Sequence, residues 1–234
     1  MQLAAAGADI VLNDLPNAPG LEETAAEIRR LGRDAFVFGS DAFSREGCEA
    51  IVEEAVRVAG HIDILVSSPS YSRRAGFLDY PAELWQRMLD STLSPGFHLS
   101  QLVARHMVAR RIRGKITFIS SVQANMPAEL CLGYCTAKAG LNQMMRNIAV
   151  ELTPHRINVN AIEPGWIDTP KERETFTEEL LASEGAKLPW GRIGVQVRGT
   201  ELSGLSTLFE LFTYGNLQRS GRDRRTLAHH NSGR

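Results

Sequence analysis

Short apolar runs alternate along the chain with longer segments in which apolar residues recur every three or four positions. A run of four to six apolar residues bounded by turn residues is typical of a strand buried on both faces. Strands separated by helices of ten or more residues are joined by helical crossovers and are therefore parallel. The expected strands are 9–13, 35–38, 62–66, 116–119 and 157–162.

The helical segments have recognisable beginnings and ends. Gly7 and Gly32 stand where helices should end, and Ser44 is an N-cap residue. Pro95 lies inside the longest segment and should kink or break it. The expected helices are 1–6, 21–31, 44–59, 81–111 and 133–153.

This alternation predicts an α/β fold with a doubly wound parallel sheet, Rossmann-like in its architecture. In such open sheets ligands bind beyond the carboxyl ends of the strands. Five residues each follow a predicted strand at that end: Asp14, Asp41, Ser67, Ser121 and Pro164. Their common position indicates a nucleotide site.

Composition restricts the class of protein. The 234 residues carry a net charge of −1, which gives no reason to expect nucleic acid or an anionic membrane as a partner. No apolar run approaches the ~20 residues of a membrane span, and no basic stretch marks a secretory signal. The chain has three cysteines, Cys48, Cys131 and Cys135. Because this is an odd number without the spacing of a disulfide framework, a reducing, cytoplasmic location is expected. No other Cys or His pair accompanies Cys131 and Cys135 at finger spacing, so thiols lining the core are favoured over zinc and no metal is expected.

Ser121, Tyr134 and Lys138 form the strongest candidate for chemistry. Tyr134 and Lys138 fall one helical turn apart, on one face. A phenol titrates near pH ~10, and a nearby ammonium group should lower its pKa. The tyrosine could then exchange a proton with an alcohol or carbonyl oxygen that the serine hydroxyl holds, while a cofactor carries the hydride. The alternative is a surface tyrosine and lysine that share this spacing by chance.

These residues, together with the segment 157–165 (INVNAIEPG), resemble the short-chain dehydrogenase/reductase family. The likeness covers about 1–194 and is strongest to compact members that act on sugars, alcohols or acyl ketones. It implies that Tyr134 is the acid/base and that Ser121 orients the substrate oxygen. It implies that Lys138 lowers the pKa of Tyr134, and that Tyr134 and Lys138 lie against the nicotinamide ribose.

The resemblance also implies a cofactor site. Asp14 would accept hydrogen bonds from the adenosine ribose and repel a 2′-phosphate, which favours NAD over NADP. Asp41 and Ala42 match the pair that contacts adenine, and Ser67 begins the segment that replaces the family's Asn-Asn-Ala-Gly. The loop that holds the nicotinamide carboxamide is matched by Pro164, Gly165, Ile167 and Thr169. Each match has an alternative interpretation. Asp14 could be a turn aspartate, Asp41 an acid at a helix entry, and Pro164 with Gly165 an ordinary Pro-Gly turn.

The chain departs from the family pattern in several places. The first strand and its glycine-rich turn should precede Gly7, and a last strand should follow 194, so we expect a sheet that lacks both. Thr92 stands where the family has an asparagine that anchors a proton-relay water. The expected organisation is an incomplete domain over 1–194, a possible helix within 195–217 and a disordered basic tail over 218–234. That tail carries arginines without aromatic residues and is expected to be solvated rather than bound to nucleic acid.

Two functions follow from this sequence. The first is an NAD-dependent oxidoreductase that acts on a small alcohol or ketone, assembled as a homo-oligomer through the helices near 81–111 and 133–153. The second is a truncated, catalytically silent relative that serves only as a partner subunit or is a non-functional fragment. The charged segment 171–189 is expected to be a mobile substrate loop that does not identify the substrate.

Overall fold

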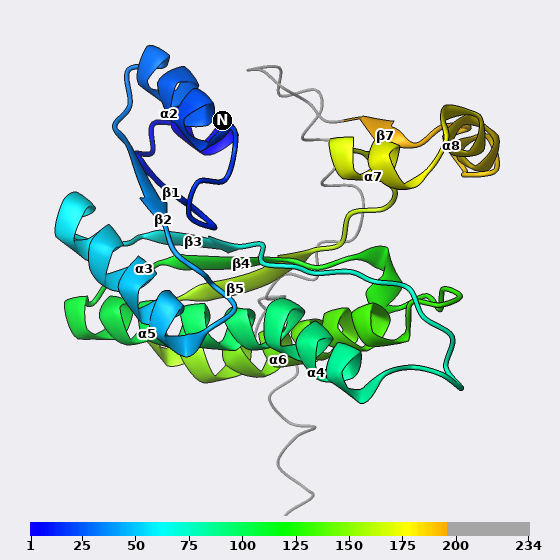
Figure 1. Cartoon of the computed structure of the whole chain (residues 1–234). Helices are drawn as coiled ribbons and strands as arrows, with labels where there is room; N and C mark the ends of the chain where they lie inside the picture. Colours follow the sequence, from blue (N-terminus) through cyan, green and yellow to red (C-terminus); the bar gives the residue numbers. More distant parts are fainter. Residues whose placement is uncertain (196–234) are drawn as a thin grey trace, which may run out of the picture.

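Strands and helices alternate in the computed structural model, which describes residues 1–195, and the expected α/β fold is confirmed (Figure 1). The strands are β1 (Ile10–Asp14), β2 (Ala35–Gly39), β3 (Ile64–Ser67), β4 (Lys115–Ile119), β5 (Asn158–Ile162), β6 (Ile167–Asp168) and β7 (Gly194–Val195). The helices are α1 (Gln2–Ala5), α2 (Leu21–Arg30), α3 (Arg45–Ala59), α4 (Ala82–Thr92), α5 (Ser94–Arg110), α6 (Leu132–Leu152), α7 (Pro170–Thr175) and α8 (Glu178–Gly185). Two 3₁₀ turns complete the set, η1 (Val122–Ala124) and η2 (Thr153–His155).

The strands form three separate parallel sheets. β1 pairs with β2, β3–β4–β5 form a second sheet in that order, and β6 pairs with β7. No strand within residues 1–195 lies between β1 and β3, so each of these strands has one edge without a strand partner. The Rossmann-like sheet is therefore divided into a β1–β2 part and a β3–β4–β5 part.

Two hydrophobic clusters correspond to this division. Helices α3, α5 and α6 lie on one side of β3–β4–β5, where Ile116, Phe118 and Val159 are fully buried against them (Figure 1). A smaller cluster joins α2 to β1 and β2, with Ala25 and Ile28 buried between them. Burial of apolar surface is the main stabilising contribution in both clusters.

The expected long helix over 81–111 is two helices in the structure. α4 ends at Thr92, and α5 begins at Ser94 with Pro95 in its first turn. Proline has no backbone N–H to donate and its ring clashes with the preceding turn, so the break falls where Pro95 predicts it. Pro95 is tolerated in the first turn of α5 because N–H groups there have no partner within the helix.

The segment 171–189, expected to be a loop, contains two helices, α7 and α8, and its expected mobility stays a prediction. Thr169 caps α7 by accepting a hydrogen bond from the Glu172 N–H, and Thr177 caps α8 in the same way through Leu180. Each threonine caps a helix by accepting a hydrogen bond from the backbone N–H three residues later. A threonine in this position is a local signal for the start of a helix, which the many charged residues of the segment made easy to overlook. The expected helix within 195–217, beyond Val195, and the expected tail over 218–234 lie outside the described residues.

None of the helices within residues 1–195 is long and apolar enough to cross a bilayer.

Candidate active site

Ser121 and Tyr134 meet at the carboxyl end of β4. Ser121 follows that strand by two residues and caps η1, accepting a hydrogen bond from the Gln123 N–H at 3.2 Å. Tyr134 lies in the first turn of α6, and its phenol is near enough to the side chains of Ser121 and Ser70 for both to lower its pKa. The sequence thus paired Tyr134 with Ser121 as the structure does, but it did not identify Ser70.

Lys138 lies one turn further along α6, beneath the same site. Its side chain is buried, its Nζ donates to the Ile119 carbonyl at 2.7 Å, and it lies 5.6 Å from the centroid of the Tyr134 ring. The ammonium group is therefore fixed by the last carbonyl of β4. The three residues expected to act together, Ser121, Tyr134 and Lys138, lie together in the structure.

Burial is the largest influence on the pKa values of Tyr134 and Lys138. It raises the pKa of Tyr134, and the hydrogen bonds to Ser121 and Ser70 lower that pKa only in part. The lowering expected from Lys138 is not seen, because burial opposes the charged form of both groups. Burial also lowers the pKa of Lys138 from 10.5 to about 8, so its ammonium form still prevails at neutral pH.

The depressed pKa of Lys138 predicts a pH-dependent stability. Between about pH 8 and 10.5 the unfolded chain keeps the lysine proton and the folded chain does not, so stability rises with pH across that window. We expect the parent chain to gain on the order of 3 kcal/mol relative to Lys138→Met between pH 7 and pH 10. Urea unfolding of both chains at pH 7, 8, 9 and 10 measures this difference.

The matched control for that series is Lys187→Met. Lys187 is exposed on the surface, where it pairs with Glu184, so the difference in stability between Lys187→Met and the parent should stay nearly constant with pH. If the difference in the free energy of unfolding between Lys138→Met and the parent also stayed constant with pH, the lysine would titrate normally in the folded chain. Its burial would then not govern the site.

Asp14 and Asp41 occupy corresponding positions at the carboxyl ends of β1 and β2. Both are exposed, and each accepts one backbone hydrogen bond from its own turn: Asp14 from the Leu15 N–H at 2.7 Å and Asp41 from the Phe43 N–H at 2.9 Å. Asp14, Asp41 and Ala42 line the same cavity of about 980 Å³, together with Ser70. One carboxylate oxygen of each aspartate accepts a hydrogen bond within its own turn, which is the alternative role given above. Both aspartates also line the cavity that Ser70 lines.

The segment after β5 lies against the Ser121 turn. The Pro164 carbonyl accepts a hydrogen bond from the Val122 N–H at 3.1 Å, and Ile167 pairs with Gly194 between β6 and β7. Thr169 uses its hydroxyl to cap α7, as described above. Ser67, the last residue of β3, is buried. Pro164 is thus placed next to the catalytic candidates. Ser67, in contrast, is buried, and the Thr169 hydroxyl is engaged in the cap of α7.

Thr92 holds the segment that carries Ser70. Its hydroxyl donates to the Tyr71 carbonyl and accepts from the Tyr71 N–H, both at 3.1 Å, and the residue is almost fully buried. Both hydrogen bonds go to the backbone next to Ser70. This position therefore fixes the loop after β3, and through it the hydroxyl that contacts Tyr134.

Glu163 is a buried carboxylate that the sequence did not identify as important. It accepts hydrogen bonds from the side-chain amides of Asn125 at 2.8 Å and Asn142 at 2.6 Å. These partners lie after η1 and on α6, so Glu163 joins three segments that surround the site. Its place inside INVNAIEPG was the available signal, because a lone acid in an apolar segment needs hydrogen-bond partners.

Within residues 1–195, no three His, Cys, Asp or Glu side chains gather as metal ligands. The described cysteines are free thiols, and Cys131 and Cys135 flank Tyr134 on α6.

Comparison with known proteins agrees with this geometry. The sequence pattern described as short chain dehydrogenase matches residues 1–180. The chain belongs to this family. It is 33% identical over 197 residues to (-)-trans-carveol dehydrogenase of Rhodococcus erythropolis, which covers 79% of this chain and 71% of that protein. It is 31% identical over 194 residues to 2-dehydro-3-deoxy-D-gluconate 5-dehydrogenase of Escherichia coli K12, covering 82% and 76%.

Solved structures show the same relationship. Acetoin dehydrogenase of Enterobacter cloacae superposes with a TM-score of 0.76 at 28% identity, covering 90% of this chain and 81% of that one. A 7α-hydroxysteroid dehydrogenase, solved in complex with NADH and 7-oxo glycochenodeoxycholic acid, superposes with a TM-score of 0.78 at 30% identity, covering 89% and 79%. These relatives are dehydrogenases, so the family of this chain is one of oxidoreductases acting on alcohol and carbonyl groups.

Proposed function

We propose that this protein is an oxidoreductase that transfers a hydride between NAD(H) and a small alcohol or ketone, with Tyr134 as its acid/base. The observation that carries this proposal is the contact of the Tyr134 phenol with the Ser121 hydroxyl, one turn from the buried Lys138. Within a family of alcohol and carbonyl oxidoreductases, that arrangement is the one that can move a proton at a substrate oxygen.

The roles of these side chains follow from their chemistry. The Ser121 hydroxyl would donate a hydrogen bond to the substrate oxygen and so hold it near the phenol. Tyr134 would take the alcohol proton during oxidation and return it to the carbonyl oxygen during reduction. Lys138, held by the Ile119 carbonyl 5.6 Å from the Tyr134 ring, would contact the nicotinamide ribose. The nicotinamide, when bound, supplies the hydride acceptor or donor.

The residues at the strand ends fit a dinucleotide. Asp14 and Asp41 are exposed carboxylates on the cavity that also reaches Ser70, so a ligand lying across it would touch both the adenosine side and the catalytic side. A carboxylate at Asp14 can accept hydrogen bonds from ribose hydroxyls and repels a phosphate group. Ala42 would lie against adenine, and the loop of Pro164, Gly165, Ile167 and Thr169 against the nicotinamide.

Replacement of Asp14 is expected to change cofactor preference. Asp14→Ser removes the charge that repels a 2′-phosphate, so the ratio of the NADPH to the NADH dissociation constant should fall by tenfold or more. Glu23→Ser, which removes an exposed acid on α2 outside that cavity, is the control and should leave the ratio unchanged. Titration of each chain with both cofactors measures the ratio. An unchanged ratio in Asp14→Ser would remove Asp14 from the cofactor site.

The substrate class we propose is a sugar, polyol or acyl ketone. The relatives named above act on carveol and on a deoxy-gluconate, and other similar proteins include glucose 1-dehydrogenase 2 of Bacillus subtilis. These names share dehydrogenation at a carbon that carries a hydroxyl group. A screen of sugars, sugar acids and cyclic alcohols, followed by NADH absorbance, would separate them.

We also propose a cytoplasmic homo-oligomer, either a dimer or a tetramer. Phe97 on α5 is 43% exposed and Val150 on α6 is 74% exposed, so both helices present apolar side chains outward. Exposed apolar side chains on neighbouring helices are suited to burial against a second copy. The free thiols fit a reducing compartment.

Binding of NADH tests the central proposal. We expect saturable energy transfer from tryptophan to the nicotinamide, with a raised melting temperature. The chain carries Trp85, Trp166 and Trp190 as donors. A cooperatively folded chain that shows no saturable binding would contradict the proposal and favour the catalytically silent partner subunit.

A further inference from the structure

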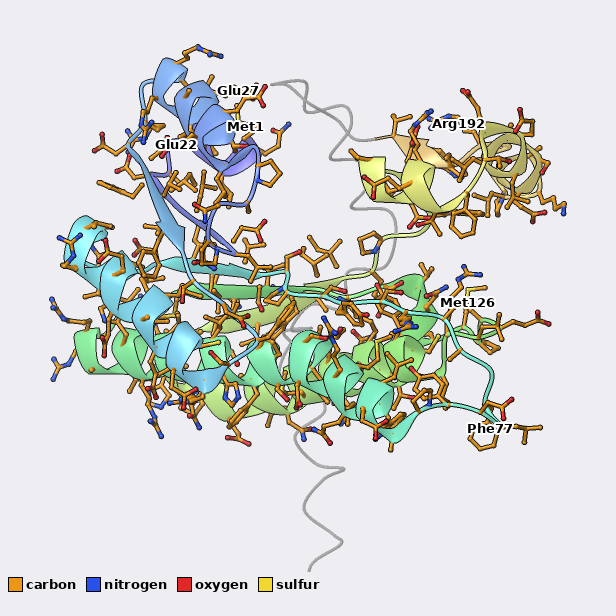
Figure 2. The ribbon with its side chains drawn as sticks, in the orientation of Figure 1. Met1, Glu22, Glu27, Phe77, Met126 and Arg192 are labelled. Carbon is orange, nitrogen blue, oxygen red and sulfur yellow. The ribbon has the colours of Figure 1, made fainter. Side chains whose placement is uncertain are left out.

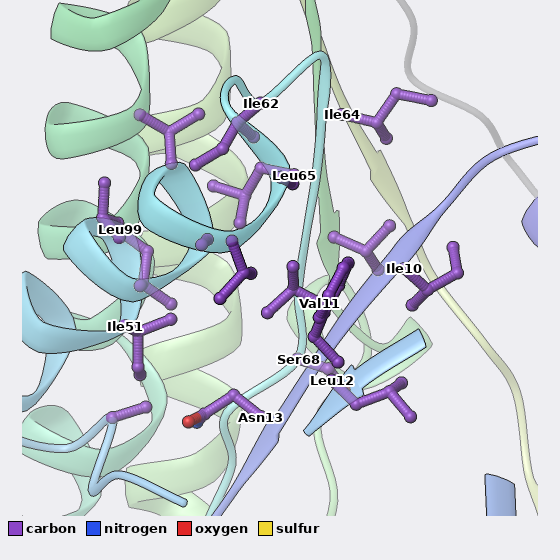
Figure 3. Close-up of a pocket in the computed structure, with 18 of the residues that line it drawn as sticks. Ile10, Val11, Leu12, Asn13, Ile51, Ile62, Ile64, Leu65, Ser68 and Leu99 are labelled. Carbon is purple, nitrogen blue, oxygen red and sulfur yellow. The ribbon is translucent and has the colours of Figure 1, made fainter. Parts of the chain in front are cut away.

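The connection between β3 and α4, residues 68–81, joins the proposed cofactor cavity to α7. It begins at Ser68, which is labelled in Figure 3 and lines the cavity together with Pro69 and Ser70. Ser70 lies near enough to the Tyr134 phenol to influence its pKa. The residues after Ser70 therefore lead from the cavity, past the candidate acid/base, to the side of the molecule on which α7 lies (Figure 1).

Three contacts hold this connection in place. The hydroxyl of the buried Thr92 forms two hydrogen bonds of 3.1 Å with the Tyr71 backbone. The Arg87 guanidinium lies 4.3 Å from the centroid of the Tyr71 ring. The Ala75 N–H donates to the Leu130 carbonyl at 3.0 Å, just ahead of α6. The side chains between these points are thus carried by a fixed backbone.

Arg74 belongs to this fixed part and reaches α7. Its guanidinium lies 5.1 Å from the centroid of the Phe176 ring, at the end of that helix. The attraction between a cation and a ring face favours this position of the charge. Phe176 in turn packs edge-to-face on Trp166, with 5.5 Å between the ring centroids. Because Trp166 directly follows Gly165, Arg74 is held beside the loop that we assign to the nicotinamide.

The charge of Arg74 has no acidic partner within residues 1–195. Two acids near α7 are already engaged. Glu172 accepts a hydrogen bond from the Trp166 indole N–H at 2.7 Å, and Asp168 is bound by Arg173 through both of its carboxylate oxygens. A ring contact does not satisfy the N–H groups of a guanidinium, so the exposed Arg74 keeps donors for a ligand.

We propose that Arg74 binds a carboxylate group of the substrate, so that the alcohol oxidised at this site belongs to a hydroxy acid. A guanidinium matches the two oxygens of a carboxylate as a bidentate pair. Arg74 follows Ser70 by four residues, at most about 13 Å of extended chain, so a small molecule can reach both Arg74 and the phenol of Tyr134. This inference rests on the proposed function and names the substrate class of the same site.

The proposed reaction keeps its balance with such a substrate. The carbon that bears the hydroxyl gives a hydride to NAD, and the hydroxyl gives its proton to Tyr134. The product is a keto acid whose carboxylate is unaltered. Arg74 would therefore determine specificity by holding the far end of the substrate, and would take no part in the transfer of the hydride or the proton.

Matched acids and amides test the substrate class. Threonate, xylonate and gluconate are each compared with the corresponding primary amide, which keeps every hydroxyl and removes the negative charge. We expect kcat/KM for the best acid to exceed that of its amide by about tenfold or more, the usual effect of a charge-assisted hydrogen bond. Oxidation is followed by NADH absorbance.

Replacement of Arg74 tests the residue. Arg74→Gln should lower kcat/KM for that acid by about 10- to 100-fold and change it by less than about threefold for the amide. Arg74→Lys keeps the charge without the paired donors and should recover part of the loss. The matched control is Arg73→Gln, which removes the neighbouring exposed arginine and should keep the preference for the acid. NADH titration of each variant should give the dissociation constant of the parent.

Four results would overturn the inference and leave the proposed reaction standing. A parent chain that oxidises the amides as well as the acids, or that oxidises cyclohexanol and none of the acids, does not recognise a carboxylate. A preference for the acid that survives in Arg74→Gln would assign the anion to another residue. Equal losses in Arg74→Gln and Arg73→Gln would show that net charge, rather than one contact, attracts the acid. A chain that oxidises no alcohol, charged or neutral, would instead contradict the proposed function itself.

Discussion

Tyr134→Phe is expected to lower kcat/KM for oxidation of an alcohol substrate by about 10²–10⁴-fold, the usual contribution of a general acid/base. The phenol is the group that contacts Ser121, and phenylalanine keeps the ring while removing the proton that must move. NADH binding should change little, because most of the proposed cofactor contacts come from other residues. Initial rates with NAD, together with NADH titration of the same preparation, measure the two effects.

Tyr71→Phe is the matched control for this substitution. Tyr71 lies next to Ser70 in the loop, its ring is stacked under the Arg87 guanidinium at 4.3 Å, and the substitution keeps that ring. Activity should stay within about twofold of the parent. A Tyr134→Phe chain that retained full activity would exclude Tyr134 as the acid/base, even with cofactor binding intact.

Glu163→Ala is expected to destabilise the fold by about 3 kcal/mol. The substitution leaves the amides of Asn125 and Asn142 without their buried acceptor, and each unsatisfied donor costs about 1–3 kcal/mol. Because the carboxylate joins the η1 turn, α6 and the end of β5, loss of activity should accompany the loss of stability. Urea unfolding monitored by circular dichroism measures the change in the free energy of unfolding.

Glu184→Ala is the control for the loss of a carboxylate. Glu184 pairs with Lys187 on the surface, where an ion pair contributes little, so the free energy of unfolding should change by less than about 1 kcal/mol. Equal stability of Glu163→Ala and the parent would mean that the cost of burying this carboxylate cancels its two hydrogen bonds.

Taken together, the site depends on segments that lie far apart in the sequence. Tyr134 and Lys138 come from α6, Ser121 from the end of β4, Ser70 from the loop after β3, and Glu163 from the end of β5. Met126, labelled in Figure 2, lies just after η1, the turn that Ser121 caps. Hydrogen bonds from Thr92 and Glu163 hold those loops. Substitutions at these two positions would therefore act through geometry rather than through contact with the substrate.

The sequence by itself determined the five principal strands and the candidate trio of Ser121, Tyr134 and Lys138. Alternation of apolar runs with helical periodicity located the five principal strands, because that signal is local and repeats within each element. Pro95 located the break between α4 and α5 for the same reason. The four-residue step from Tyr134 to Lys138 placed both on one helix face, and Ser121 followed from its place after an apolar run.

Only the tertiary structure decided which side chains meet. The contact between Ser70 and Tyr134 joins residues 64 positions apart, and nothing local to either residue specifies it. The same is true of the contact between Glu163 and Asn142, which joins the end of β5 to α6. The pKa of Lys138 also depends on the tertiary structure. Burial among distant segments lowers this pKa, and the spacing of Lys138 from Tyr134 in the sequence does not reveal that burial.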